Sequence, residues 1–149
     1  LADKRYLTLV KGKMSRPVGT IDIRLAEHQQ TARSRRERGI NLQEAITHYR
    51  VLATGKGVSL LECRTERGAP IKSPATSPPV VGDRKYGDFP FNREARKNWG
   101  LTRQFLHARH LALPHPMTEK KMVFDAPLPA ELVEVLQKAG ISWTKSKRA

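Results

Sequence analysis

The sequence RYLTLVK at Arg5–Lys11 alternates between two sets of side chains and is rich in β-branched and aromatic residues. Tyr6 and Val10 belong to one set, and Leu7 and Leu9 belong to the other. Successive side chains of a strand point to opposite faces of a sheet, so this alternation predicts a β-strand. The glycine that follows is expected to end the strand.

Further segments of strand character follow along the chain. They are Gly19–Leu25, Gln43–Leu52, Val58–Arg64, Gln104–Leu113 and Lys121–Phe124. A Gly-Lys-Gly sequence at residues 55–57 is typical of a hairpin turn, here between the second and third of these segments. Strands in succession indicate an α+β fold that is mainly antiparallel sheet with few helices.

Two segments have helical character. Pro129–Ala139 predicts a helix, because a proline stands at its start and a glycine follows it. Leu132, Val133 and Leu136 are expected to share its buried face. Arg93–Trp99 predicts only one or two helical turns.

Three segments are expected to be irregular. Ala26–Arg38 is polar and crowded with arginines, and Ala69–Pro79 contains four prolines, which lack the backbone donor of a strand or helix. Residues 142–149 form a basic tail. The remaining residues, 1–141, are then expected to form one domain, since a chain of this length can bury a single core.

The 149 residues carry a large excess of positive charge. Lys and Arg number 28 against 14 Asp and Glu, which gives a net charge of +14. Such an excess is typical of proteins that contact phosphates, as in RNA. No apolar stretch approaches the ~20 residues that cross a bilayer, and no secretory signal opens the sequence, so no membrane partner is expected. Cys63 is the sole cysteine, which excludes an internal disulfide and fits the reducing cytoplasm.

Sequence patterns for nucleotide-cofactor or metal chemistry are missing from the chain. It has no P-loop and no GxGxxG sequence. His107 and His110 lie on a predicted strand, where their odd separation would point them to opposite faces. They are therefore not expected to share a metal ion. We expect no metal, no cofactor and a monomer.

Several short motifs occur in a fixed order through the chain. They are KRYLTLVKG at Lys4–Gly12, EAITHYRVL at Glu44–Leu52, LLEC at Leu60–Cys63, GDRKYG at Gly82–Gly87, FLHA at Phe105–Ala108, HPMT at His115–Thr118 and APLP at Ala126–Pro129. In this order they resemble the C-terminal part of the catalytic domain of RNA pseudouridine synthases of the RluA family, and most closely its RluC-like branch.

The resemblance implies isomerisation of uridine to pseudouridine in RNA, with large-subunit ribosomal RNA as the substrate class and no cofactor. In the family, an aspartate acts at a flipped-out uridine, a tyrosine lies against the base, and a basic residue of a third motif pairs with the aspartate. Only the tyrosine carries over to this chain, onto Tyr6. The alternative for Tyr6 is an aromatic side chain that packs in the core.

Two departures from the family pattern predict that this chain alone is inactive. It contains no His-Arg-Leu-Asp sequence, which carries the catalytic aspartate, so no catalytic residue is assigned. Where the family's third motif reads Glu-Thr-Gly-Arg-Thr-His-Gln-Ile-Arg, residues 66–73 read Glu-Arg-Gly-Ala-Pro-Ile-Lys-Ser. The competing hypothesis is a non-catalytic RNA-binding or ribosome-associated protein on the same scaffold.

A frameshift is one explanation of residues 67–79. With suitable codons, deleting one base from the family's third motif yields the residues found at 66–73. The alternative is a genuine proline-rich loop. Resequencing the gene across this segment distinguishes the two hypotheses.

Clustered cationic side chains are the candidates for RNA binding. They are Arg33, Arg35, Arg36, Arg38, Lys72, Arg84 and Lys85, with Lys145, Lys147 and Arg148 in the tail. We expect them to contact phosphates, which makes the affinity for RNA fall steeply with salt. The alternative is a solvated surface that contacts nothing.

Overall fold

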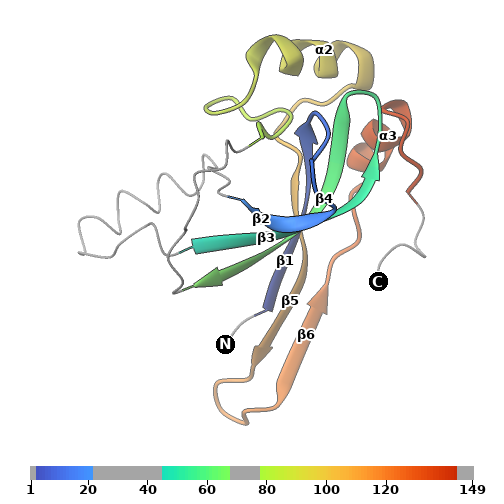
Figure 1. Ribbon diagram of the computed structural model, residues 1–149. Coiled ribbons are helices and arrows are strands. Elements are labelled where there is room, and N and C mark those ends of the chain that lie inside the picture. The colour runs from blue at the N-terminus through green and yellow to red at the C-terminus, as the bar shows by residue number, and fades with distance from the viewer. Residues whose placement is uncertain (1–2, 22–44, 68–77, 144–149) are drawn as a thin grey trace.

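The computed structural model of the chain describes residues 3–21, 45–67 and 78–143 (Figure 1). The strands are β1 (Asp3–Lys11), β2 (Val18–Ile21), β3 (Ala45–Thr54), β4 (Val58–Arg67), β5 (Leu106–Pro114) and β6 (Lys121–Asp125), and the helices are α2 (Phe89–Trp99) and α3 (Ala130–Lys138). The strands form one sheet in the order β2-β3-β4-β1-β5-β6, and every neighbouring pair is antiparallel. The predicted α+β fold is confirmed.

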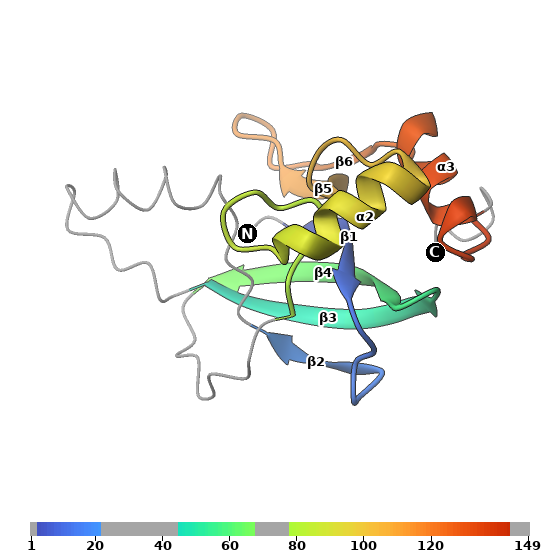
Figure 2. The same ribbon diagram turned by 90° about the horizontal axis from the view of Figure 1, so that it is seen from above.

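The alternation in β1 places apolar side chains on both faces of the sheet. Leu9 lies opposite Leu60 of β4, and both pack with Phe105 and with residues of α2 and α3 in the larger core. The next residue, Val10, belongs to a second, smaller cluster that also contains Leu61 of β4. Figure 2 shows both helices on the same side of β3 and β4. The larger core therefore lies on the helix-covered face and the smaller cluster on the other face.

The predicted strands agree with the structure at most positions. The hairpin at residues 55–57 joins β3 to β4, and Gly57 has a φ of 70°, a value that favours glycine. Gly19–Leu25 was expected to be a strand, and its described part lies within β2. The expected loops Ala26–Arg38 and Ala69–Pro79 fall almost wholly outside the described residues, as does most of the basic tail.

The two helices correct the sequence prediction in detail. α3 forms where expected, but Val135 is buried with Leu132 and Leu136, in place of Val133. α2 begins four residues before the predicted Arg93, because the Asp88 carboxylate accepts a hydrogen bond from the N–H group of Phe91 and a proline occupies the first turn. α2 is therefore a full helix of 11 residues.

A bulge in β5 corrects the prediction for the two histidines. The register with β1 shifts between Arg5 and Tyr6, so that His107 lies opposite Leu7 while His110 lies opposite Arg5. Because Arg5 and Leu7 are two residues apart on β1, this register puts both histidines on the same face of the sheet. The expected opposite orientation was wrong, since the extra residue, Arg109, resets the alternation.

Candidate nucleic-acid interface

Tyr6 lies in the middle of β1, opposite Cys63 of β4 and Ala108 of β5. Its half-buried ring packs against the smaller cluster, which includes Tyr49 and Leu61, on the face away from the helices. Both interpretations of Tyr6 fit this position, because part of the ring packs in the cluster and part remains accessible. Stacking on a base stays a prediction.

Cys63 lies opposite Tyr6 and is buried. Desolvation by burial, together with the neighbouring Glu62 carboxylate, raises the pKa of the Cys63 thiol to about 12. A thiol with this pKa is protonated at neutral pH and is a poor nucleophile. Cys63 therefore serves the packing beneath Tyr6 rather than covalent chemistry.

Three arginines from three strands converge on Glu62 of β4, a group that we call the Glu62 cluster. One Glu62 carboxylate oxygen lies 2.8 Å from Arg109 of β5, and the other lies 3.3 Å from Arg50 of β3 and 3.9 Å from Arg5 of β1. The side chains of Glu62 and Arg109 are only 9% and 10% exposed. The bulge at Arg109 thus brings a nearly buried guanidinium onto a nearly buried carboxylate.

A turn at Gly82 and Asp83 is held together by a network of hydrogen bonds. The buried Asp83 carboxylate accepts hydrogen bonds from the N–H groups of Lys85 and Tyr86, at 2.9 Å and 3.2 Å. The Asn92 amide accepts one from the Gly82 N–H at 2.7 Å and donates one to the Asp83 carbonyl at 2.8 Å. Asn92 therefore fastens the turn to α2.

Gly82 cannot be replaced at this turn without strain. Its φ is 86°, and a Cβ atom would lie 2.2 Å from the carbonyl oxygen of Arg103. Any L-residue with a side chain is strained in this conformation. The close approach brings the turn against the segment that follows α2.

Asp88 joins the start of α2 to the end of β1. Its carboxylate forms an ion pair with Lys11 and accepts the Phe91 N–H at 3.0 Å. The hydrogen bond from Lys11, and next the one from the Phe91 N–H, lower the pKa of Asp88 below its ordinary value. α2 is therefore held by a charged cap.

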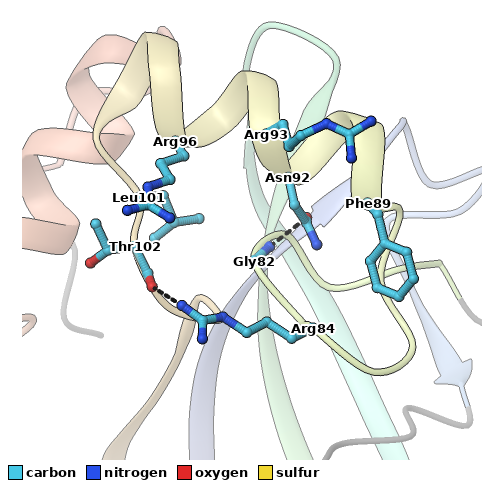
Figure 3. A pocket seen from close by; sticks show the side chains of 8 residues that line it. All are labelled: Gly82, Arg84, Phe89, Asn92, Arg93, Arg96, Leu101 and Thr102. Carbon is cyan, nitrogen blue, oxygen red and sulfur yellow. Dashed lines mark hydrogen bonds between the residues drawn. The ribbon is translucent and has the colours of Figure 1, made fainter.

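A cavity of about 370 Å³ lies between this turn and α2 (Figure 3). It is lined by Gly82, Arg84, Phe89, Asn92, Arg93, Arg96, Leu101 and Thr102, with no acidic residue among them. We call it the arginine pocket, after Arg84, Arg93 and Arg96. In Figure 3 the guanidinium groups of Arg84 and Arg96 both extend toward the Thr102 end, and Arg93 lies at the end beside Phe89.

The polar contacts of these arginines involve no carboxylate in the part of the chain that the structure describes. Arg84 donates a hydrogen bond to the Thr102 carbonyl oxygen at 3.5 Å. Neither Arg93 nor Arg96 has an acidic partner among the described residues. Among the described residues, no carboxylate balances the positive charge that these arginines bring to the pocket.

The structure separates the sequence-predicted RNA-binding residues. Arg84 joins the pocket, and Lys85 is exposed on the turn but does not line the pocket. Arg33, Arg35, Arg36, Arg38, Lys72 and the three basic residues of the tail lie outside the described residues. Tyr6 is not brought to the pocket, because the pocket residue Leu101 belongs to the larger core and Tyr6 packs on the smaller cluster.

Sequence reasoning missed Arg93 and Arg96 as site residues. They are three positions apart on α2, a spacing that places side chains on one helix face. The Asp-Phe-Pro sequence at the start of the helix could have revealed them, because it shows where α2 begins and therefore which of its side chains share a face. The residues of the Glu62 cluster were missed as well, since they come from four strands.

The described residues contain neither a candidate metal site nor a candidate membrane-spanning helix. Within 3–21, 45–67 and 78–143, no group of three or more His, Cys, Asp or Glu side chains is placed to hold a metal ion. In the same ranges, no helix has the length and apolar character to span a membrane.

The chain aligns with curated RNA pseudouridine synthases over most of its length. An uncharacterised RNA pseudouridine synthase of Mycobacterium bovis is 34% identical over 143 residues, which span 91% of this chain and 44% of that protein. YlyB of Bacillus subtilis, described in the same words, is 33% identical over 144 residues, or 92% and 45% of the two chains. Ribosomal large subunit pseudouridine synthase D of Nitrosomonas europaea is 33% identical over 139 residues, or 90% and 40%. The chain thus spans less than half the length of these relatives, and no family model matches it.

Two solved structures share the arrangement of strands and helices. Human RNA pseudouridylate synthase domain containing 4 has a TM-score of 0.61 and 23% identity, covering 93% of this chain and 62% of that one. Human RNA pseudouridylate synthase domain containing 1 has a TM-score of 0.57 and 26% identity, covering 86% and 55%. The described residues have a pseudouridine synthase fold. The fold that the motifs implied is confirmed, and so is the homology to RNA pseudouridine synthases.

Proposed function

We propose that this chain is part of an RNA pseudouridine synthase that isomerises uridine to pseudouridine in large-subunit ribosomal RNA. The observation that carries the proposal is the alignment of about nine tenths of the chain with proteins that bear this name, at 33–34% identity. The relative from Nitrosomonas europaea, named for the ribosomal large subunit, supports that RNA as the substrate class. A finer assignment to the RluC-like branch rests on the motifs at Gly82–Gly87 and Phe105–Ala108.

Tyr6 is the residue that we assign to the reaction. Its ring sits on β1 at the face away from the helices, with a rigid packed cluster beneath it. Isomerisation requires the uridine to leave the base stack, and an aromatic ring held on a strand offers a surface against which the flipped base can lie. The reaction needs no cofactor in this proposal, and we propose a cytoplasmic monomer.

The chain as given is proposed to be inactive by itself. It has no His-Arg-Leu-Asp sequence, and no arginine stands at the corresponding position of the third motif. General acid–base or covalent participation by a carboxylate requires one held at the base. Asp83 is occupied by the N–H groups of its own turn, and Asp88 by Lys11 and the start of α2.

A fusion that supplies the catalytic aspartate motif and the family's third motif tests the proposal. The chain is fused to the region of YlyB that precedes the alignment, and residues 67–79 are replaced by the corresponding YlyB residues. We expect this fusion to form pseudouridine in unmodified large-subunit RNA, as mapped chemically, whereas the 149-residue chain forms none. Y6A should abolish the product in the fusion. Product from the chain alone would disprove the claim of inactivity.

The second candidate is a non-catalytic RNA-binding protein on this scaffold. The altered third motif at residues 66–73, together with the net charge of +14, favours it. It predicts RNA binding by the chain and no pseudouridine from the fusion. A fusion that binds RNA without forming product would therefore replace the first proposal by the second.

A further inference from the structure

We infer that the arginine pocket binds single-stranded RNA away from the Tyr6 face, with Arg84 and Arg96 holding one backbone phosphate and Arg93 an adjoining one. Phe89 would stack on a base between them. The inference rests on the proposed function, since RNA is the substrate there, but it concerns a different surface of the chain.

Two other exposed basic residues show what an acidic partner looks like here: Arg103 pairs with Glu131 at 3.2 Å and Lys138 with Glu134 at 3.3 Å. The pocket arginines have none among the described residues, although two of them extend toward the same end of one cavity. Like charges gathered in this way repel each other, and an anion between them removes that repulsion. A guanidinium also presents paired N–H donors that match phosphate oxygens.

Contacts within the fold hold both walls of the arginine pocket in place. Arg84 follows the turn that Asp83 and Asn92 fasten by hydrogen bonds. The opposite wall is α2, which is capped at Asp88 and anchored in the larger core by Trp99. Both walls are therefore fixed before a ligand binds, and little ordering is required when it does.

The aromatic ring selects nucleic acid among ligands that carry phosphate. Phe89 lines the pocket and is 50% exposed, so that part of its ring is accessible to a ligand. In Figure 3 it lies at the end of the pocket occupied by Arg93. Aromatic rings beside cationic grooves are the recurring means of holding single strands, because bases stack on the ring while phosphates follow the charge. A free phosphate would gain nothing from the ring, because it has no base to stack on it.

The test measures binding of a short labelled oligouridylate to the whole 149-residue chain by fluorescence anisotropy between about 50 and about 200 mM salt. Each phosphate contact on a single strand adds about 0.7 to the salt slope, which corresponds to about fivefold in affinity near 0.1 M salt. R93Q removes one phosphate contact and R96Q weakens the contact that Arg84 still makes, so R93Q/R96Q should lower the slope by about 0.7 to 1.4 and weaken binding about 5- to 25-fold. R93K/R96K should restore most of the slope.

Two matched variants separate the pocket from general charge. K120Q/K121Q removes the same charge at exposed positions of the β5–β6 hairpin and should have a much smaller effect. F89A should weaken binding at least about fivefold while leaving the slope unchanged, because stacking releases no counterions. The proposal is wrong if R93Q/R96Q behaves like K120Q/K121Q, or if F89A binds RNA as the original chain does.

A competition assay shows whether the pocket binds free anions or the phosphates of RNA. Inorganic phosphate is added to the bound oligouridylate, with chloride at equal ionic strength as the control. We expect it to compete poorly with the oligouridylate. Strong competition that disappears in R93Q/R96Q would make the pocket a site for free anions and would overturn the inference. If the pocket variants bind RNA as tightly as the original chain does, this inference fails while the proposed function stands. If the original chain binds no RNA at low salt, both fail.

Discussion

The Glu62 cluster and the arginine pocket each gather three arginines, but they differ in where the opposite charge is. In the cluster, Glu62 supplies a carboxylate inside the sheet, at 2.8 Å from Arg109 and 3.3 Å from Arg50. In the pocket, the polar partner seen for Arg84 is the Thr102 carbonyl, and no acidic residue lines the cavity. The positive charge of the cluster is thus partnered by a carboxylate within the fold, whereas the positive charge of the pocket has no acidic partner among the described residues.

The difference teaches how to interpret basic residues in a chain with a net charge of +14. A buried carboxylate is tolerated only when charged donors surround it, so the cluster arginines are explained by the stability of the sheet. Exposed arginines without acidic partners contribute little to stability and remain available to a ligand. Net charge alone does not separate the two groups, but their partners do.

The largest expected effect comes from removing the charge of the cluster. Glu62→Gln keeps the size of the side chain but leaves Arg109, which is 10% exposed, without its carboxylate. Loss of one member of a buried ion pair costs about 3 kcal/mol. We expect a decrease of that order in the free energy of unfolding, measured by urea denaturation.

Glu131→Gln is the matched control for this substitution. Its ion pair with Arg103, at 3.2 Å, is exposed on both sides, and such pairs contribute less than about 1 kcal/mol. An equal loss of stability in the two variants would contradict the distinction between buried and exposed pairs.

The next effect concerns the turn that carries Arg84. Asp83→Ala removes the acceptor for the N–H groups of Lys85 and Tyr86 at a position only 1% exposed. Hydrogen bonds to a charged group contribute about 2 kcal/mol, and we expect a loss of that size in urea denaturation. Asp83→Asn keeps one acceptor oxygen and should lose less. Equal losses in both variants would show that the charge, and not the acceptor, holds the turn.

A smaller, pH-dependent effect is expected at Asp88. The folded-state pKa of this carboxyl lies below its ordinary value, so its ion pair stabilises the protein above about pH 4 and is lost as pH falls through the folded-state pKa. Asp88→Asn keeps a good helix cap while removing the charge. The melting temperature of D88N should lie below that of the original chain at neutral pH, and the two should converge in acid.

Lys11→Gln provides the second arm of this experiment, because Lys11 is the first cause of the lowered pKa. K11Q and D88N should lower the melting temperature by similar amounts, and the double variant should lose little more than either. A gap between D88N and the original chain that persists unchanged below about pH 2 would contradict the assignment.

Much of the fold could be predicted from the alternation of short segments. β1, β3 and β4 and the hairpin between the last two are local patterns, and α3 is marked by a proline and a glycine. The bulge at Arg109 could not be predicted, because it depends on how β5 meets β1 across the sheet. The early start of α2 was readable in Asp88 and Pro90, but the polar residues after them obscured it.

The candidate site was less predictable than the fold. Tyr6 could be named from its motif, and Arg84 as one of the clustered cationic residues. The pocket could not be predicted, because it requires α2 to pack beside a turn and beside Leu101, which follows the helix. The one carboxylate that distinguishes the cluster arginines from the pocket arginines, that of Glu62, lies on a different strand from each of them. Pairing of charges is a property of the folded chain.

The smallest expected effect on stability is the one that separates the pocket from the cluster. R93Q/R96Q removes two charges from α2, and neither guanidinium has an acidic partner among the described residues. Arg96 lies in the last turn, where a cation interacts favourably with the helix dipole by a few tenths of a kcal/mol, and loss of repulsion between the arginines offsets this. The free energy of unfolding should therefore change by less than about 0.5 kcal/mol.

The same variant should lose the stabilisation that RNA confers. A ligand at about 100 times its dissociation constant stabilises the folded state by about 2.7 kcal/mol, so the oligouridylate should raise the melting temperature of the original chain. At that RNA concentration, R93Q/R96Q should show a clearly smaller rise. A variant that is destabilised without RNA, as E62Q is expected to be, would mean that the pocket arginines stabilise the fold and that the contrast between the two groups is wrong.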